Sequence, residues 1–424
     1  MLPASSTRRV FLGSLAASLP ASAALARTKT DDRVRMAIIG LNGRGSDLAG
    51  MFAKDPGAEI VTVCDCDSRV LAKGVEAVEK AGGKTPATEQ DYRRVLDDKN
   101  VQAVIIAAPD HWHGPMTIFA CRAGKDVYVE KPACHNVAEG QAMIAAARKH
   151  NRVVQLGTQR RSASHVADAV AHLRSGAIGK IGLARGWIHQ KRQPIGHATP
   201  GPIPEELDWT LWQGPAPEQA FIPNRVHYNW HWFWHWGTGE LGNNGIHAID
   251  VARWGLGVEA PLRITSGGGK YVFEDDQEVP DTQNVTWEFD NCAITWEHRM
   301  WSKHGLEGGS GFGTAFYGDN GTLIVDEKGW RVEDGGDKAG GPASSDIGPH
   351  IANFLDCVRT RNRPNADIET GVLSTRLCLL GNIAQRTGRK LSFNAATWNF
   401  PNDAEANALL KRDYNPAFDP MKQA

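Results

Sequence analysis

Val34-Arg-Met-Ala-Ile-Ile-Gly40-Leu-Asn-Gly-Arg-Gly45 is the stretch of sequence that decides the fold. Its apolar first half is typical of a buried parallel strand, and a helical segment from Ser46 to about Lys54 follows the glycines. The layout is that of Gly-x-Gly-x-x-Gly, which brings a pyrophosphate to the first amides of a helix. Asn42 replaces the second glycine; asparagine tolerates left-handed backbone, and Gly43 can provide the close approach. The stretch predicts a dinucleotide-binding Rossmann unit.

An acidic residue ends the next predicted strand, Glu59-Ile-Val-Thr-Val-Cys-Asp65, twenty residues after Gly45. A carboxylate at this place accepts hydrogen bonds from both ribose hydroxyls and repels a 2′-phosphate. We therefore expect NAD as the cofactor in preference to NADP. Arg69 could still receive a phosphate, so NADP stays open as the alternative. A glycine turn alone is a weak signal, but the turn, its strand and Asp65 together are specific.

A lysine closes a further apolar strand, Lys125-Asp-Val-Tyr-Val-Glu130, and is followed by Pro132. The proline blocks continued pairing, so Lys131 is expected at the carboxyl end of its strand. Ligands of open α/β sheets bind at that edge. A lysine held there can be desolvated and can take part in proton transfer.

Strands and helices continue to alternate up to residue 156, with strands expected at 101–107 and 153–156 and helices at 115–123 and 138–150. Right-handed crossovers between parallel strands make this a doubly wound sheet, with Pro109 on the same edge as Lys131. His111 and His113 follow Pro109 and lack a third ligand at suitable spacing, so no metal is expected. We expect one of them near the nicotinamide and one as a helix-capping residue.

The whole chain has the composition of a globular protein. At 424 residues it is too long for one ordinary core, which favours two domains. Its 47 basic and 48 acidic residues give a net charge of −1, which argues against nucleic acid as the main partner. Seven cysteines, an odd number without framework spacing, are expected to be reduced thiols.

The N-terminus carries a targeting pattern. Thr7-Arg-Arg-Val-Phe-Leu12 is a twin-arginine motif, an apolar stretch follows it, and Ala24-Leu-Ala26 offers small residues for cleavage. Residues 1–26 are therefore predicted to be a twin-arginine signal peptide, too short and too rich in Ser, Ala and Pro to anchor the chain in a membrane. A disordered basic tail is the alternative. The prediction implies export to the periplasm by the twin-arginine machinery, which carries folded proteins and so permits cofactor uptake beforehand.

From about Gly157 the pattern changes to strands separated by long loops, and helices return near the end. The expected strands are 181–189, 262–267, 284–289, 292–299, 314–318 and 321–326, and the expected helices are 350–360 and 370–387. Gly308–Gly313 lacks the lysine of a phosphate loop, so a hairpin or lid is expected there. Asp334–Ser345 is predicted to be an exposed loop.

Four tryptophans alternate with His and Phe in the segment that runs from Trp230 to Trp236. Period-two spacing is typical of an extended segment with its aromatic side chains on one face. Histidines spaced by four, His227, His231 and His235, would suit zinc on a helix, but the aromatic density and the following glycines argue against that helix. Tryptophans stack on sugar rings, so one or two of the four are expected to face a carbohydrate or polyol. The others are expected in a core or an oligomer contact.

Taken together, the glycine turn, Ala108-Pro-Asp-His-Trp-His113 and Glu130-Lys-Pro132 resemble the Gfo/Idh/MocA family of NAD(P)-dependent oxidoreductases. Leu207–Pro217 and Asn229–Asp250 resemble an exported branch of it, and the resemblance covers nearly all of the mature chain. It implies an α/β protein: an N-terminal Rossmann domain with a doubly wound parallel sheet (33–156) and a C-terminal α+β domain with a large open mixed sheet (157–390). A tail (391–424) follows. The family acts mostly on sugars, inositols and related polyols, and we expect a homo-oligomer.

The resemblance also implies catalytic positions. The lysine of Glu-Lys-Pro matches Lys131, and a second-domain histidine matches His247, the main acid/base candidate. Several members carry an aspartate four residues before this histidine, where Asn243 stands here. Asparagine can orient a substrate but cannot titrate. Asp250, three residues after His247, could bond to it on the same helical face or support the start of the helix.

The predicted site residues fall into three groups. They are, as catalytic residues, Lys131, Asn243 and His247; as cofactor-binding residues, Gly40, Asn42, Gly43, Arg44, Gly45, Asp65, Pro109, His113, Glu130 and Lys131; and, as substrate-binding residues, Arg160, Trp236 and Asp250.

Three functions are compatible with this pattern. The leading one is a periplasmic NAD-dependent oxidoreductase of a sugar or polyol, with tightly held NAD because its compartment lacks a nicotinamide pool. The second is a glycoside hydrolase that oxidises a sugar ring transiently with bound NAD and eliminates the glycosidic substituent. The third is a non-catalytic sugar-binding protein, against which the presence of Lys131 and His247 argues.

Overall fold

The computed structural model of the protein describes residues 32–335 and 339–422. The predicted signal peptide lies outside these ranges. Among the helices of the described ranges, none combines the length and the apolar character needed to cross a bilayer. All seven cysteines are unpaired, as expected from their spacing.

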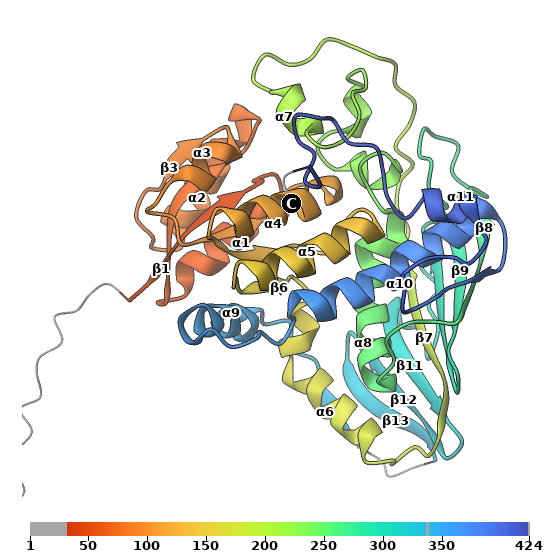
Figure 1. Cartoon of the computed structure of the whole chain (residues 1–424). Coiled ribbons are helices and arrows are strands. Elements are labelled where there is room, and N and C mark those ends of the chain that lie inside the picture. Colours follow the sequence, from red (N-terminus) through yellow and green to blue (C-terminus); the bar gives the residue numbers. More distant parts are fainter. Residues whose placement is uncertain (1–31, 336–338, 423–424) are drawn as a thin grey trace, which may run out of the picture. The chain divides into compact units, whose positions relative to one another are not determined.

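A six-stranded parallel sheet forms the core of the first domain, in the order β3-β2-β1-β4-β5-β6 (Figure 1). Its strands are β1 (Val34–Ile39), β2 (Ala58–Cys64), β3 (Ala87–Glu89), β4 (Ala103–Ile106), β5 (Asp126–Val129) and β6 (Val154–Leu156). This is the strand order of a Rossmann fold, so the expected doubly wound sheet is confirmed. The apolar run in β1 sends Met36 and Ile38 into one helical layer and Ala37 and Ile39 into the other, which explains its lack of alternation.

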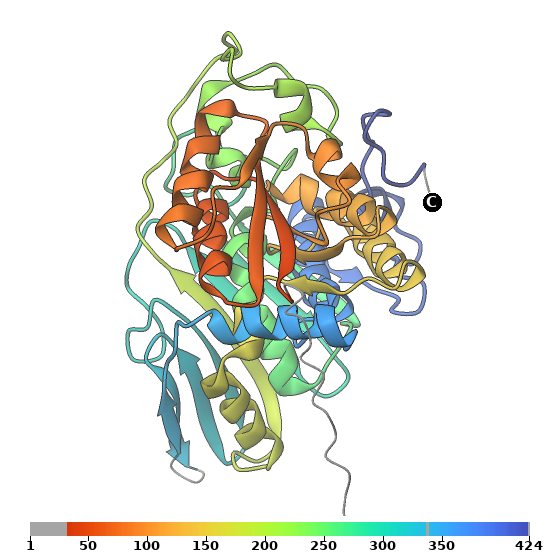
Figure 2. The ribbon, with the colours of Figure 1, turned by 90° about the vertical axis from the view of Figure 1, so that its left-hand side faces the viewer.

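Helices cover both faces of this sheet. They are α1 (Arg44–Lys54), α2 (Ser68–Lys80), α3 (Tyr92–Asp97), α4 (Asp110–Arg122) and α5 (Val137–Lys149). α1 and α2 share one face with α9 (Gly348–Thr360), which returns from the far end of the chain, while α3, α4 and α5 cover the other (Figures 1 and 2). The expected start of α4 at Pro115 was wrong, because the helix begins at Asp110 and contains that proline. The acidic Asp110 in the first turn is favourable at a helix N-terminus and supports the earlier start.

A nine-stranded mixed sheet dominates the second domain, in the order β14-β13-β12-β11-β7-β10-β9-β8-β15. Its strands are β7 (Ile181–His189), β8 (Arg263–Gly269), β9 (Thr282–Glu288), β10 (Ala293–Arg299), β11 (Phe312–Gly318), β12 (Gly321–Asp326), β13 (Gly329–Gly335), β14 (Gly340–Pro342) and β15 (Leu391–Ser392). β7 and β10 are parallel and the remaining pairs antiparallel, which confirms the large mixed sheet.

One face of the large sheet packs against helices around a core that contains Trp287, Trp296 and Phe316. These helices are α6 (Ser164–Arg174), α8 (Ile246–Leu256) and α10 (Ile368–Thr387). Two short helices, the 3-10 turn η1 (Gln159–Ser162) and α11 (Ala404–Ala408), lie at the two ends of this domain in the sequence.

Two expectations for the second domain need correction. Asp334–Ser345 is not simply a loop, because its described residues include the end of β13, which pairs with β12, and all of β14, which pairs with the start of β13. The tail from residue 391 is not separate either, because β15 forms an edge of the large sheet. Glycine-rich and terminal segments gave no local strand signal, and their pairing comes from backbone contact with a neighbouring strand.

Residues 206–238, here called the capping segment, run from the second domain across the first (green in Figure 1). They include α7 (Trp209–Gln213) and the 3-10 turns η2 (Pro223–Arg225) and η3 (Asn229–Trp232). The expected extended aromatic stretch was therefore wrong. Burial decides the conformation, since Trp232, Phe233 and Trp236 all enter cores and are at most 1% exposed.

The capping segment is bonded to the first domain at both of its ends. At its start, Asp208 donates its N–H to the carbonyl of Cys66 at 3.0 Å. At its end, His111 donates its N–H to the carbonyl of Trp236 at 3.1 Å, and the Thr238 hydroxyl donates to the Asp110 carboxylate at 2.6 Å. The segment is thus a fixed wall over the carboxyl edge of the parallel sheet.

Candidate active site

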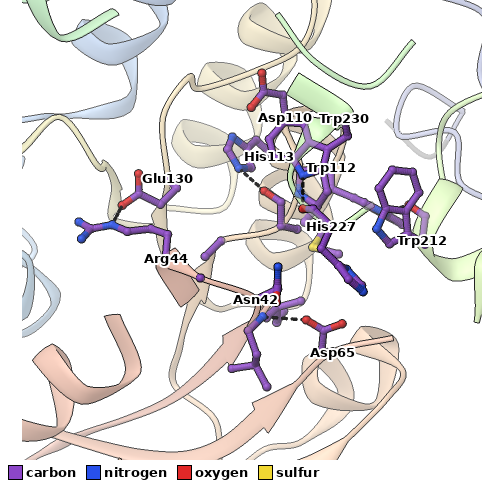
Figure 3. Close-up of a pocket in the computed structure, with 18 of the residues that line it drawn as sticks. Asn42, Arg44, Asp65, Asp110, Trp112, His113, Glu130, Trp212, His227 and Trp230 are labelled. Carbon is purple, nitrogen blue, oxygen red and sulfur yellow. Dashed lines mark hydrogen bonds and ion pairs between the residues drawn. The ribbon is translucent and has the colours of Figure 1, made fainter. Parts of the chain in front are cut away.

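A cavity of about 340 Å³ lies at the carboxyl edge of the parallel sheet, beneath the capping segment (Figure 3). Residues of both domains line it. They include Gly40, Asn42, Gly43, Arg44, Asp65, Pro109, Asp110, His113, Glu130 and Lys131 from the first domain, and Trp212, His227, Tyr228, Trp230, His231, Asn243 and His247 from the second. Nine of the ten predicted cofactor-binding residues are therefore brought to one cavity, and the tenth, Gly45, packs against Gly40, which lines it.

The glycine turn packs so closely against neighbouring backbone that Gly40 and Gly45 leave no room for a side chain. A Cβ on Gly40 would approach the backbone of Ala107 to 2.7 Å, and one on Gly45 would approach the Gly40 carbonyl oxygen to 1.8 Å. Gly43 has a φ of +70° and open space where a side chain would stand. It also precedes α1, whose first turn receives no side-chain cap. The turn therefore fits a dinucleotide, with Gly43 in the role of the missing second glycine and free amides for a pyrophosphate.

Asp65 stands at the end of β2, facing the cavity (Figure 3). Its carboxylate accepts the N–H of Leu41 at 2.7 Å and the N–H of Asp67 at 3.0 Å. These bonds fix the side chain and leave further acceptor capacity for ribose hydroxyls. Burial raises the pKa of Asp65, an effect that the two backbone bonds and the nearby His227 oppose.

An ion pair crosses the cavity floor from α1 to the end of β5. The guanidinium of Arg44 donates to the Glu130 carboxylate at 2.9 Å (Figure 3). The same carboxylate accepts the N–H of Lys131 at 3.2 Å. Glu130 therefore orients the backbone that carries the lysine.

Lys131 and Asn243 meet directly, although 112 residues separate them in the sequence. The ammonium donates to the backbone carbonyl of Asn243 at 2.8 Å and to its side-chain oxygen at 3.0 Å. Asn243 lies in a five-residue π-helix, η4 (Leu241–Gly245), directly before α8. π turns free helical carbonyls and often occur at functional sites, and here the turn presents both oxygens of Asn243 to the lysine. One of the three ammonium N–H groups is left for a substrate oxygen.

His247, in the first turn of α8, lines the same cavity as Lys131 and Asn243. Its Nδ1 is buried and has no hydrogen-bond partner among the described residues. Burial lowers the pKa of His247 well below its ordinary value, and the positive charges of Lys131, Arg160 and Arg44 lower it further. The imidazole is therefore neutral at neutral pH and can accept a proton.

His113 and Asp110, one turn apart at the start of α4, also line the cavity. The ring nitrogens of His113 lie 2.6 Å from the Pro132 carbonyl and 2.7 Å from the Ala108 carbonyl. Burial raises the pKa of Asp110, against the opposing effects of His113 and Thr238. His111 is wholly buried and bonds to the Trp212 carbonyl at 3.0 Å. The expected capping role was wrong, since Pro109 is the N-cap of α4 and both histidines lie within the helix.

The structure does not bring the predicted substrate-binding residues to the cavity. Trp236 is fully buried against Trp209 and Trp212. The Arg160 guanidinium lies 4.5 Å from the centre of the Phe312 ring. Asp250 accepts two 2.8 Å bonds from Arg161, so its expected bond to His247 does not form. Two hydrogen bonds from a guanidinium bind a buried carboxylate more strongly than one bond from a neutral imidazole. The spacing of residues along one helix gives no information about this distant arginine.

The lining residues absent from the predicted site come from both domains. Those of the first domain include Gln90, Tyr92, Asp110, Trp112 and Met116, and those outside it are Gln159, Leu211, Trp212, His227, Tyr228, Trp230 and His231. All of the second group but Gln159 come from the capping segment, whose position depends on long-range contacts. Of these, only Trp230 has a sequence signal for a carbohydrate ligand, as a member of the tryptophan stretch. Within residues 32–335 and 339–422, no cluster of three or more His, Cys, Asp or Glu is arranged to hold a metal ion.

Two family models match the chain. Residues 34–158 match the NAD-binding Rossmann fold of an oxidoreductase family, and residues 186–297 and 340–419 match the C-terminal alpha/beta domain of an oxidoreductase family. The two matches follow the two domains seen in the structure.

Among curated proteins, the chain is 37% identical over 112 residues to glycosyl hydrolase family 109 protein 2 of Shewanella sp. (strain ANA-3), covering 26% of this chain and 25% of that protein. It is 32% identical over 165 residues to scyllo-inositol 2-dehydrogenase (NAD(+)) of Bacillus subtilis (strain 168), covering 39% of this chain and 47% of that protein. The matches thus span about a quarter to a half of these relatives.

Among solved structures, the aldose-aldose oxidoreductase from Caulobacter crescentus, complexed with glycerol, aligns with a TM-score of 0.65 and 22% identity. The alignment covers 85% of this chain and all of that one. At this identity the likeness concerns the fold, and it includes both domains.

Proposed function

The chain belongs to the Gfo/Idh/MocA oxidoreductase family, and on this premise we propose that it is an NAD-dependent oxidoreductase acting on a secondary hydroxyl, or the corresponding ketone, of a sugar or polyol. One observation carries the proposal: Lys131, Asn243 and His247 line the same cavity as the glycine turn and Asp65. The relative named scyllo-inositol 2-dehydrogenase (NAD(+)) supports a polyol or sugar as substrate.

The catalytic groups have separable roles in the proposed oxidation. The neutral imidazole of His247 accepts the proton of the substrate hydroxyl. The Lys131 ammonium donates its remaining N–H to the same oxygen and stabilises the negative charge that develops there. Asn243 holds the lysine in place through two acceptors, without a charge of its own. When bound, NAD supplies the acceptor for the hydride that leaves the carbon.

Hydrolysis through transient ring oxidation is the second candidate. The relative named glycosyl hydrolase family 109 protein 2 is the observation that favours it. The same residues serve both functions, because both begin with removal of a hydroxyl proton. The products separate them, since a hydrolase releases a free sugar and leaves the oxidation state of its cofactor unchanged.

We expect the purified protein to release NAD on denaturation, detected by mass spectrometry. Addition of sugars and polyols, free and as glycosides, should then produce NADH absorbance with one of them. A free sugar released from a glycoside without net NADH would contradict the dehydrogenase and establish the hydrolase. Binding of sugars with neither product would indicate a non-catalytic binding protein.

Two further expectations are proposals. We propose export to the periplasm with the cofactor already bound, on the strength of the twin-arginine motif Thr7–Leu12. Replacing Arg8 and Arg9 by lysine should leave the protein in the cytoplasmic fraction of fractionated cells, and unchanged export would contradict the proposal. We also propose self-association into a homo-oligomer, which light scattering of the purified protein measures.

A further inference from the structure

Asp67 is a fully buried carboxylate in the turn between β2 and α2, and it is bonded to two residues, Arg69 and His227. The Arg69 guanidinium donates to it through Nε at 2.8 Å and through Nη2 at 2.5 Å, in a two-pronged arrangement. The imidazole Nε2 of His227, from the capping segment, lies 2.8 Å from the carboxylate. Asp67 also accepts the backbone N–H of Arg69 at 3.0 Å and so caps α2.

These contacts lie beside the carboxylate proposed to receive the ribose. Asp65 accepts the N–H of Asp67, and His227 is directed toward Asp65 in the cavity (Figure 3). In the turn from Asp65 to Val70, Arg69 is the only cation of the sequence. It is therefore the group that a phosphate on the ribose would need, but both prongs of its guanidinium are directed at Asp67.

The ion pair persists at neutral pH. Burial alone would raise the pKa of Asp67, but hydrogen bonds from Arg69 outweigh it and hold that pKa below its usual value. The carboxylate thus stays charged and holds the arginine throughout the pH range of ordinary measurements. His227 adds a second-domain contact to the same oxygen that receives Nη2.

We propose that Asp67 is a second cofactor-specificity residue, which excludes NADP by holding Arg69 away from the ribose that Asp65 receives. Asp65 repels a 2′-phosphate directly, whereas Asp67 removes the cation that would otherwise compensate for that repulsion. The inference rests on the proposed use of NAD. It assigns the preference for NAD over NADP to two carboxylates, one that repels the 2′-phosphate and one that binds the nearby arginine.

The test is a set of binding measurements on the full-length protein, freed of dinucleotide on charcoal, with tryptophan fluorescence as the signal. NAD and NADP are the first pair of probes, and adenosine 5′-monophosphate and adenosine 2′,5′-bisphosphate are the second. Asp67→Asn keeps a residue that caps helices well, but it removes the charge that binds the Arg69 guanidinium. We expect this variant to bind NADP and the bisphosphate about tenfold more tightly than the wild type, because the Arg69 guanidinium becomes available to form charge-assisted hydrogen bonds with the phosphate. NAD and the monophosphate should change little.

The chain offers a matched control in Asp91 and Arg93. Asp91 caps α3 as Asp67 caps α2, and it holds the arginine two residues later in the same two-pronged way. Asp91→Asn should leave all four affinities unchanged. Asp67→Asn combined with Arg69→Ala should lose the gain for NADP, and Arg69→Ala alone should bind both dinucleotides as the wild type does.

Each outcome decides a separate point. No gain of NADP binding in Asp67→Asn, or the same gain in the double variant, overturns the role of Asp67. Weaker NADP binding in Arg69→Ala alone would also overturn it, because the arginine would then already contact the phosphate. Failure of the wild type to bind NAD would instead remove the proposed function, and would be seen before any variant is compared.

Discussion

Lys131→Met is expected to lower kcat by about a thousandfold, a size typical of losing a charged group that acts on the reacting oxygen. Methionine keeps most of the length of the side chain but cannot donate to Asn243 or to a substrate hydroxyl. The cofactor should stay bound, because the glycine turn and Asp65 do not depend on the lysine. The measurements are kcat on the substrate identified from the sugar panel and the NAD content by mass spectrometry.

Three further variants test this expectation. Lys149→Met, an exposed position in the last turn of α5, should keep full activity. Lys131→Arg keeps the charge but not the ammonium geometry, so it should remain strongly impaired. His247→Asn should also lose activity, by about a hundredfold. Normal turnover in Lys131→Met would remove the lysine from the mechanism.

Acid should destabilise the folded protein well above the range in which most carboxylates protonate. His298 and His350 are each 1% exposed, and burial lowers the pKa of each to about 4. Between pH 6.5 and 4 the unfolded chain protonates these histidines and the folded protein does not. Stability is therefore complete above pH 6.5 and falls as the pH is lowered, by about 1.4 kcal/mol per pH unit for each histidine.

Burial lowers the pKa of both histidines, and one hydrogen bond to each ring fits the neutral form. The Ser162 hydroxyl pairs with Nδ1 of His350 at 2.8 Å, and Nε2 faces the Leu156 carbonyl at 3.0 Å. Trp296 donates its indole N–H to Nδ1 of His298 at 3.2 Å. Each ring thus uses one nitrogen as acceptor, which protonation would abolish.

Urea unfolding at pH 7.5, 6 and 5 measures the effect, which across the window amounts to about 3 kcal/mol per histidine against a total stability of about 5–15 kcal/mol. His350→Gln can still donate to Leu156 and accept from Ser162, so it should reduce the slope of stability against pH. His197→Asn is the control, because that side chain is 71% exposed. An unchanged slope in His350→Gln would contradict this account.

The parts of the site predictable from the sequence are those built within one βα unit. The glycine turn, Asp65 and the strand that carries Lys131 depend on neighbours a few residues away, and their positions follow from the topology of a parallel sheet. The apolar run in β1 and the clear strand of β7 were readable for the same reason. Asn243 and His247 needed the family resemblance, since a histidine at a helix start has no distinctive local pattern.

The remaining parts depend on contacts between distant segments. The alternation of the tryptophan stretch predicts an extended segment, yet its conformation is set by the burial of Trp232 and Trp236 against other segments of the chain. Helical spacing predicts a bond between Asp250 and His247, but Arg161, 89 residues away in the sequence, binds the Asp250 carboxylate instead. His227 meets Asp67 across 160 residues. No window of sequence contains such pairs.

The π turn at Asn243 has a consequence for how this site tolerates divergence. One of the two hydrogen bonds that the Lys131 ammonium donates to residue 243 goes to its main-chain oxygen, which every amino acid at this position would supply. A chain with aspartate there would hold the lysine at the same point and add a negative charge beside it. The side chain at position 243 can therefore be neutral or acidic in different members of the family, while the main-chain bond keeps Lys131 in the same position relative to His247.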